Sequence, residues 1–558
     1  MLEKNSFTNF TNRTLNILFF IATLSLVIFL QFRSQILSQF SLLYGDRYDA
    51  VIVVTILEHW FNVLNGFSNW SEVNYFYPYT NTLGHTDGYF IVGIIYSAFR
   101  YFGLDPFLSS ELVNITVRVI GFCAFFIACR KLFNLPFGWS LLAASLFILS
   151  NNNTIHGQRL QLASVAFTPI LAILLSYACR ALYTENSKQL LLFGSTAGVF
   201  LGAWSVTCFY MTWFFIFFTT FFFAILILNT GSTRLNVLKD KIKSQKFFVL
   251  SILVITVLSL LPLLSIYLPK SKETGVRLYT SVVGNTVPIE GILQVGSENF
   301  MFGKIYNGLL SFFFPDYSPN GEYYNTGIAP IIFFLFLAGI IFIFKNKHTK
   351  IHGHFWLSFC LTTLVTWILT LNFSGYSAWY IVFQLFPGAK ALRIVAAYQI
   401  FLTLPVIIIG IHYLSLNSCK VPPAILFLLV SLLCLEELNT GRTLLIREDE
   451  IKRVSLQKQP PQQCTAFFVT GWTNQDTATP MPELINNYYA HNVSAMLIAE
   501  LIHLPTINGF ASFNPPDWNF GYPNNADYIQ RIKQYAEKHQ IKGLCKLNLN
   551  RLTWDTSW

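Results

Sequence analysis

The stretch LNILFFIATLSLVIFL, residues 15–30, is followed at residues 45–49 by the acidic segment GDRYD. An apolar run of this kind can cross the hydrocarbon core of a bilayer, which is about 30 Å thick. Carboxylates placed where such a span emerges into water are costly to keep near lipid, so they indicate a site rather than packing. If residues 46–49 are helical, Asp46 and Asp49 lie three apart and share one face.

The composition defines the class of protein. Of the 558 residues, 53% are hydrophobic and only 11% are charged, and the mean hydropathy is +0.49. Ordinary soluble domains carry about a quarter charged residues, so we interpret the chain as a polytopic membrane protein. The formal charge of +10 does not indicate nucleic-acid binding, because the basic residues recur between apolar runs instead of gathering in one patch.

We predict an all-α membrane domain, residues 1–438, with about 11 transmembrane helices of the length that a bilayer demands. The predicted spans cover residues 15–31, 111–129, 137–150, 164–182, 190–206, 210–229, 247–268, 328–344, 355–371, 394–413 and 422–438. Lysines and arginines recur in every second connection, which places the N-terminus in the cytoplasm. The apolar stretch 89–102 is too short for a crossing, so we expect an interfacial or re-entrant helix at the outer face.

This topology leaves three long loops and the C-terminus at the outer face: loops 32–110, 151–161 and 269–327, and residues 439–558. The C-terminal stretch has a polarity and length that suit a small soluble α+β domain docked over the membrane part. It holds Cys464 and Cys545, which either pair in an oxidising compartment or remain free thiols. We expect a multi-pass protein of a bacterial inner membrane with a periplasmic C-terminal domain.

The first outer loop carries most of the candidate chemistry. Asp46 and Asp49 are followed by His85 and Asp87 in the segment YPYTNTLGHTD, residues 77–87. A carboxylate at this surface can accept a proton from an attacking hydroxyl that lies within hydrogen-bond reach. It can also ligate a hard divalent cation. The alternative is a solvated loop whose acids cap short helices.

Basic residues occur in the other outer segments. The second loop contains His156 and Arg159, and the segment PGAKALR, residues 387–393, lies at the outer end of a predicted span. Arginine can hold a phosphate through two parallel hydrogen bonds, and an arginine on the outer side runs against the orientation bias. The alternative for Arg159 is a side chain that extends toward lipid headgroups. We assign substrate binding to His85, His156, Arg159, Lys390 and Arg393.

Motifs of several other protein classes are missing from the sequence. It contains no Gly-x4-Gly-Lys-Ser/Thr loop, no Gly-x-Ser-x-Gly elbow and no His-Glu-x-x-His. The sequence therefore gives no support to ATP-driven transport, or to serine or zinc hydrolysis, within this chain.

Taken together, these segments resemble the GT-C superfamily of integral-membrane glycosyltransferases. The shared plan is a first span, a long outer loop that opens with GDRYD, a helix with Glu58-His59-Trp60, and YPYTNTLGHTD leading to Arg118. Within that superfamily the chain is similar to bacterial members that carry YPxxNTLxxxD, PGxxALR and, in the tail, NGxxxxxPP at residues 508–516.

The resemblance implies transfer of a sugar from a polyprenyl-phosphate carrier to a glycan, lipid or other acceptor at the outer face. By this pattern Asp46 is the general base, Asp49 and Asp87 are further catalytic acids, and the basic residues hold the carrier phosphate. A divalent cation, Mg²⁺ or Mn²⁺, is left open, with Asp46 and Asp87 as its ligands if it is present. The second loop has His156 and Arg159 where several family members have an acid, which weakens the case for a metal.

Two other functions stay open: a transporter or flippase for lipid-linked glycans, and a non-catalytic scaffold that presents the C-terminal domain. A transporter is expected to carry ionisable groups deep within its spans, and internal repeats. Here Arg118 is the one clear charge in the middle of a predicted span, and no repeat is evident. A scaffold is expected to lose all function with its tail.

Overall fold

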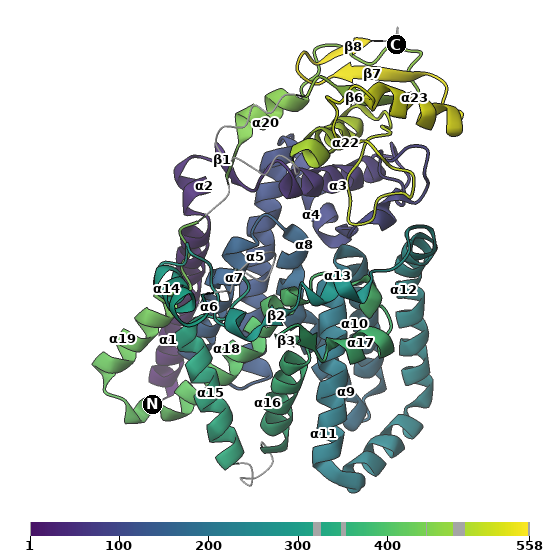
Figure 1. Cartoon of the computed structure of the whole chain (residues 1–558). Coiled ribbons are helices and arrows are strands. Elements are labelled where there is room, and N and C mark those ends of the chain that lie inside the picture. The colour runs from purple at the N-terminus through teal and green to yellow at the C-terminus, as the bar shows by residue number, and fades with distance from the viewer. Residues whose placement is uncertain (1, 316–324, 347–352, 442–443, 473–485, 556–558) are drawn as a thin grey trace.

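The computed structural model describes residues 2–315, 325–346, 353–441, 444–472 and 486–555. Long helices fill most of the molecule, and the N-terminus lies near the end opposite to the C-terminal strands (Figure 1). The C-terminal elements lie above α3 (Asp49–Leu64) and α4 (Phe90–Tyr101) in this view. The arrangement is that of a helical membrane protein with a small mixed unit at one end.

Seven segments of the described residues are long and apolar enough to cross a membrane. They are Arg13–Gln31 in α1 (Leu2–Gln31), Pro106–Lys131 (α5), Leu160–Tyr183 ending in α9 (Thr168–Tyr183), Ser187–Thr207 (α10), Phe209–Gly231 in α11 (Phe209–Ser244), Lys246–Thr274 (α12) and Val395–Lys420 around α18 (Tyr398–Asn417). Each coincides with one of the predicted spans.

The other four predicted spans fall on shorter helices: α6 (Phe137–Leu149), α15 (Pro330–Lys345), α16 (Gly353–Ile368) and α19 (Pro423–Glu436). Even α15 and α16, with 16 residues each, extend only about 24 Å, less than a typical hydrocarbon core. The number of crossings therefore stays a prediction. The stretch 89–102 forms the 12-residue α4, which packs against α3 and α5, and its short length fits the predicted interfacial helix.

The local sequence explains the start of α5 and the close packing of α10. The carboxylate of Asp105 accepts hydrogen bonds from two backbone N–H groups in the first turn of α5, and Pro106 occupies the first helical position. In α10, Gly194, Gly198 and Gly202 recur every four residues, and a methyl group at each would lie within 2.4 Å of an atom of α12. These glycines allow the two helices to approach closely.

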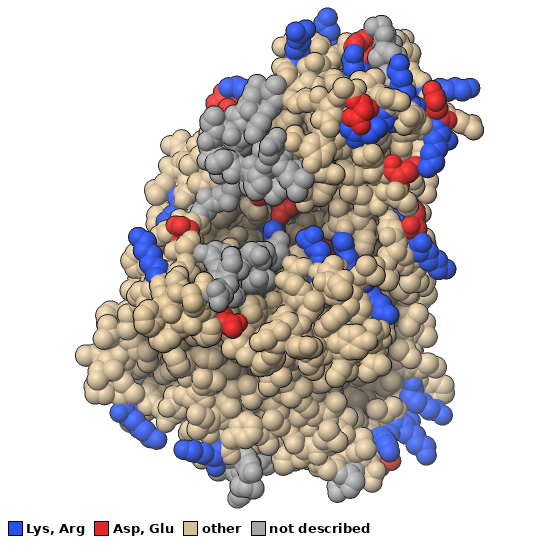
Figure 2. Space-filling view, viewed as in Figure 1, with Lys and Arg blue, Asp and Glu red and all other residues tan. Residues whose placement is uncertain are grey.

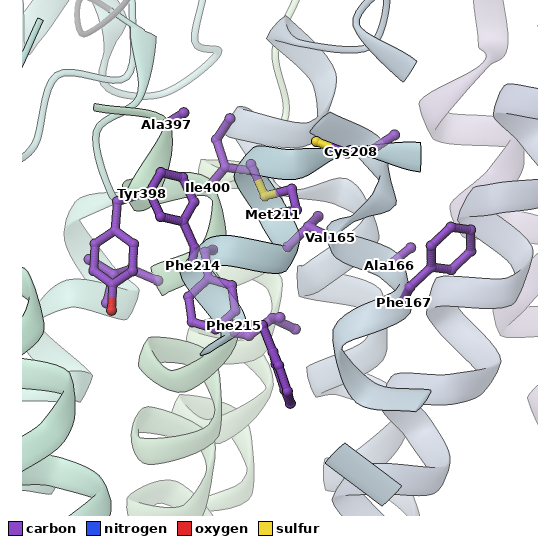
Figure 3. Packing of buried hydrophobic residues seen from close by; sticks show 14 of the residues in the cluster. Val165, Ala166, Phe167, Cys208, Met211, Phe214, Phe215, Ala397, Tyr398 and Ile400 are labelled. Carbon is purple, nitrogen blue, oxygen red and sulfur yellow. The ribbon is translucent and has the colours of Figure 1, made fainter. Parts of the chain in front are cut away.

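Aromatic side chains join α11 to α18 in the main hydrophobic core. The ring centroids of Phe214 and Tyr398 lie 5.1 Å apart in an edge-on arrangement, and Met211 and Ile400 belong to the same cluster (Figure 3). An aromatic pair of this kind adds about 0.5–1.5 kcal/mol beyond its burial. The core thereby fixes the outer ends of α11 and α18 relative to each other.

Two small sheets tie the outer segments together. β1 (Leu42–Tyr44) pairs antiparallel with β5 (Leu444–Ile446), which joins the first outer loop to the C-terminal region. β2 (Val287–Pro288) pairs parallel with β3 (Leu371–Phe373), and β3 pairs antiparallel with β4 (Tyr376–Ser377). The short helices are α2 (Arg33–Leu37), α7 (Asn151–Ile155), α8 (Leu160–Ala163), α13 (Tyr279–Val283), α14 (Gly303–Phe313) and α17 (Trp379–Leu385).

The C-terminal region contains both helices and a sheet. Its described elements are α20 (Arg447–Val454), β6 (Ala466–Thr470), α22 (His491–Ile502), α23 (Tyr528–Lys538), β7 (Leu544–Asn548) and β8 (Thr553–Asp555). β6 and β7 pair parallel, and β7 and β8 pair antiparallel. A disulfide joins Cys464 to Cys545, so the structure has the paired state of these two cysteines.

α22 belongs to two hydrophobic clusters. Val493, Met496 and Leu497 lie in the main core with side chains of α3. Ala495 and Ile498 lie in a smaller cluster with β6 and β7. Because it is buried on both sides, α22 joins the C-terminal sheet to the helices below it.

Charged side chains gather at the ends of the molecule. Figure 2 shows mostly Lys and Arg at the lower end, both signs in the upper part, and a broad uncharged belt above the lower end. An apolar belt fits a bilayer environment. Which end faces the cytoplasm stays a prediction.

Candidate functional site

The acidic segment of the first outer loop is a turn rather than a helix. α3 begins at Asp49, and Asp46 precedes it. The Oδ1 atom of Asp46 accepts hydrogen bonds from the backbone N–H groups of Tyr48 (2.9 Å) and Asp49 (2.8 Å). The two carboxylates therefore do not share one helix face, because Asp46 satisfies free N–H groups at the start of α3. This capping contact is the one that the alternative interpretation predicted.

The second outer loop contacts both acids. The Nε2 of Gln158 donates to the Oδ2 of Asp46 (2.9 Å), and the Nε of Arg159 forms an ion pair with the Oδ2 of Asp49 (2.9 Å). Burial, together with the charge of Asp49, raises the pKa of Asp46 above its ordinary value. The side chain of Asp49 is 35% exposed and that of Arg159 is 22% exposed, so this pair is still in contact with solvent.

Asp87 lies in a loop that contacts three helices. Its Oδ1 accepts the backbone N–H of Phe209 (3.0 Å), the first residue of α11. The indole of Trp60 in α3 donates to the carbonyl of Gly88 (2.6 Å), and the N–H of Tyr89 donates to the last residue of α10 (3.1 Å). Burial raises the pKa of Asp87 to about 6, so this carboxyl is half protonated in mildly acidic solution.

Two tyrosines lie between the acids and Arg393. The hydroxyl of Tyr89 is within electrostatic reach of Asp87 and Asp49. Tyr210 is within electrostatic reach of Asp87 and Arg393, and its hydroxyl accepts the backbone N–H of Arg393 (2.7 Å). Burial and the charge of Asp87 raise the pKa of Tyr89 far above its ordinary value, so its hydroxyl stays protonated.

The basic side of the site comes from two segments. Lys390 and Arg393 of the PGAKALR segment are exposed, and the backbone N–H of Arg277 donates to the carbonyl of Lys390 (3.2 Å). Burial, and then the charge of Arg393, lower the pKa of Arg277. The guanidinium of Arg277 lies 4.1 Å from the ring centre of Phe513 and donates to the carbonyl of Ser512. Two guanidinium groups close together make a surface that suits a phosphate.

The two predicted histidines are buried. The Nδ1 of His85 forms a hydrogen bond with the carbonyl of Phe513 (2.6 Å). Burial, and next the charge of Lys270, lower the pKa of His85 to about 3, so this ring is neutral near pH 7. His156 lies at the C-terminal end of α7, and its carbonyl accepts the backbone N–H of Arg159 (2.9 Å). His85 thus contacts the C-terminal region, whereas His156 shapes the turn before Arg159.

The sequence analysis missed Arg277, Tyr89 and Tyr210. Arg277 lies in the third outer loop, so its charge runs against the orientation bias in the same way as that of Arg393. That signal was present and could have been used. The two tyrosines gave no signal, because the sequence has 26 of them and only the fold shows which ones lie between charges.

A divalent metal does not fit the predicted ligands. Asp46 is engaged by two backbone N–H groups and Gln158, and Asp87 accepts the N–H of Phe209. Within the described ranges, no group of three or more His, Cys, Asp or Glu side chains could hold a metal ion. Hard divalent cations need several free oxygen ligands, so no metal enters the function proposed below.

Hollows occur near the site on two scales. A small cavity beside the second outer loop is lined by Tyr44, Glu111 and Gln158, among others. The Oε2 of Glu111 accepts the backbone N–H of Tyr44 (3.0 Å). Figure 2 also shows a broader hollow between the C-terminal end and the long helices, with acidic and basic side chains near each other.

The fold and the site define a helical membrane protein that assembles acids, arginines and tyrosines near one end of its helices. No model of a known family and no curated protein matches the chain. It is similar to the crystal structure of the oligosaccharyltransferase of Archaeoglobus fulgidus in the apo form, with a TM-score of 0.48 and 13% sequence identity. The similarity covers 94% of this chain and 69% of the archaeal chain. At this level of similarity it defines neither the family nor the substrates of this chain.

Proposed function

We propose that the chain is a GT-C-type membrane glycosyltransferase that moves a sugar from a polyprenyl-phosphate carrier to a hydroxyl acceptor at the outer membrane face. One observation carries the proposal: acids of the first outer loop and arginines of distant segments share one site. Arg159 pairs with Asp49, and Tyr210 is within electrostatic reach of Asp87 and Arg393. Glycosyl transfer from a lipid phosphate needs a base at the acceptor and cations at the leaving group, and this site offers both.

Asp46 is the general base in this proposal. Its raised pKa makes its ionised form a stronger proton acceptor than an ordinary aspartate. It takes the proton of the acceptor hydroxyl as that oxygen bonds to the anomeric carbon of the sugar. The bond from this carbon to the phosphate oxygen breaks, and its electron pair stays on polyprenyl phosphate. Asp49 holds Arg159 beside the base, and Asp87 is a further acid of the site.

The cations bind the carrier phosphate. Arg393 and Arg277 are close enough for their charges to interact, so an anion between them relieves their repulsion. Lys390 lies in the same exposed segment, and the protonated hydroxyl of Tyr89 can donate a hydrogen bond at the opposite side. We further propose that residues 439–558 form the outer-face unit that covers this site and residues 1–438 form the membrane part.

The proposal is tested with purified protein in lipid nanodiscs and a panel of radiolabelled polyprenyl-phosphate sugars. We expect release of polyprenyl phosphate together with labelled product for at least one donor. Asp46→Asn should abolish transfer while leaving expression and thermal stability intact. Asparagine keeps an oxygen for the N–H groups of Tyr48 and Asp49, and the amide of Gln158 can rotate to accept its new N–H group.

The matched control is Glu72→Gln, which removes an exposed acid of the same loop and should keep full activity. Full activity in Asp46→Asn would remove Asp46 as the base. Movement of a lipid-linked glycan across proteoliposomes without cleavage of its phosphate bond would replace the enzyme with a transporter.

A further inference from the structure

A second polar site lies away from the acids and arginines described above. A small cavity lies between the end of α6, the start of α15, the middle of α18 and the end of α19, and Asn152, Thr403 and Glu437 contribute its polar side chains together with Ser150. Its other lining residues are Gly327, Ile328, Ala329, Ile332, Val406 and Ile407.

The polar atoms that face this cavity are oxygen acceptors. Asn152 is 3% exposed, and its Nδ2 donates to the carbonyl of Thr326 (3.0 Å). Because a carbonyl accepts only from a donor, this hydrogen bond fixes the amide orientation and turns Oδ1 away from it. That Oδ1 is buried and has no hydrogen-bond partner among the described residues. Thr403 donates its proton to the carbonyl of Gln399 (3.1 Å), so its oxygen is also left as an acceptor.

The cavity is negative. Glu437 is 3% exposed, and its Oε2 accepts the backbone N–H of Asn151 (2.8 Å). The neighbouring Glu436 is fully buried and accepts the backbone N–H groups of Ile331 and Ile332. No lysine or arginine lines the cavity, and within the described part of the chain neither glutamate forms a salt bridge at a printed distance.

Two helices also end at this place. Ser150 is the C-terminal capping residue of α6, and Glu437 is that of α19. The C-terminal end of a helix carries a partial negative charge, and such ends together with free carbonyls hold sodium ions in other membrane proteins. Every one of these features favours a positive charge in the cavity.

We propose that this cavity binds a sodium ion through oxygens of Glu437, Asn152 and Thr403. Hard oxygen ligands select alkali and alkaline-earth cations rather than transition metals. Calcium and magnesium usually take more than one carboxylate, and here the second acid, Glu436, is already engaged by the start of α15. One carboxylate with neutral oxygens matches a single positive charge.

The sodium site bears on the second outer loop. Asn151 binds Glu437 at the start of the loop, and Gln158 and Arg159 bind Asp46 and Asp49 at its end. Sodium therefore stabilises the loop from the side opposite to the acids of the candidate site. This inference does not depend on the proposed enzymatic activity.

The test measures thermal unfolding of the full chain in nanodiscs while sodium chloride replaces choline chloride at constant ionic strength. We expect a saturable rise of about 2–5 °C in Tm with sodium, as a site-specific ligand gives. Glu437→Gln should abolish the rise. Glu298→Gln, an exposed acid of the third outer loop, and Asp46→Asn should both keep it.

Direct binding of ²²Na⁺ to the wild-type protein, and its loss in Thr403→Val, test the site even if Glu437→Gln does not fold. Equal Tm values in sodium and choline, with no ²²Na⁺ bound, would overturn the proposal. So would a Tm that depends on pH alone and loses this dependence in Glu437→Gln, because the occupant would then be a proton on the carboxyl. An equal rise with potassium would overturn the assignment to sodium.

Discussion

At the scale of single residues, Asp87 and Asp46 differ in what holds them. Asp46 accepts three hydrogen bonds, two of them from the backbone at the start of α3. Asp87 accepts one from the start of α11, and burial dominates its environment. The same residue type therefore caps a helix at one position and remains a titrating group at the other.

We expect Asp87→Asn to flatten the dependence of stability on pH. The folded pKa of about 6 lies above the ordinary value of 3.8, so burial favours the protonated form. That advantage is complete below about pH 3.8 and is lost as pH rises through 6. Asparagine keeps the acceptor for Phe209 but does not titrate. Tm measured from pH 4 to 8 should fall less steeply in the variant than in the wild type, and parallel curves would contradict the prediction.

At the scale of elements, the contact between α3 and α22 centres on one buried acid. Glu500 of α22 accepts the side-chain N–H of Asn62 in α3 (2.7 Å) and the backbone N–H of Asn74 (2.8 Å). His59 lies 3.9 Å away, and burial lowers its pKa to about 4. The contact is therefore polar at its centre and apolar around it, where Val493, Met496 and Leu497 pack.

We expect Glu500→Ala to weaken this contact by about 2–4 kcal/mol, because it leaves two buried N–H groups without an acceptor. Protease accessibility of the C-terminal region and the Tm of its unfolding should both report the loss. The control Glu537→Ala removes an exposed acid of α23 and should change neither. Burial also raises the pKa of Glu500 to about 7, so wild-type stability should decline as pH rises from about 4.5 through 7.

The disulfide acts on the sheet of the C-terminal region. It joins residues 81 positions apart, and closing a long loop lowers the entropy of the unfolded chain. We expect the double substitution of Cys464 and Cys545 by serine to cost about 2–4 kcal/mol. Dithiothreitol should destabilise the wild type to a similar extent and leave the variant unchanged. A variant as stable as the oxidised wild type would show that the bond has no stabilising role.

At the scale of the whole molecule, the C-terminal region is part of the main core rather than an appended unit. α22 fills the core with side chains that face α3, and β5 pairs with β1 of the first outer loop. The Asp46 turn lies between that β1 strand and α3. The acids of the candidate site are therefore held by elements that themselves depend on the C-terminal region.

Removal of residues 439–558 should consequently leave insertion into the membrane intact but lower stability and abolish transfer. All segments that can cross a membrane remain in this truncated chain, whereas the buried face of α3 becomes exposed. Size-exclusion chromatography in detergent should show aggregation, and the transfer assay should show no product. A monodisperse, fully active truncated chain would make the tail an independent attachment.

The sequence by itself determined the class of protein and the positions of its helices, because apolar runs and the period of basic residues are local properties. It also marked Asp46, Asp49, Arg159 and Arg393, since charges near apolar segments are conspicuous. Only the tertiary structure decided that Asp46 caps α3, that Arg277 lies beside Arg393, and that Glu437 and Asn152 share a cavity. These contacts join segments hundreds of residues apart, and no local pattern encodes which distant partners the packing of helices brings together.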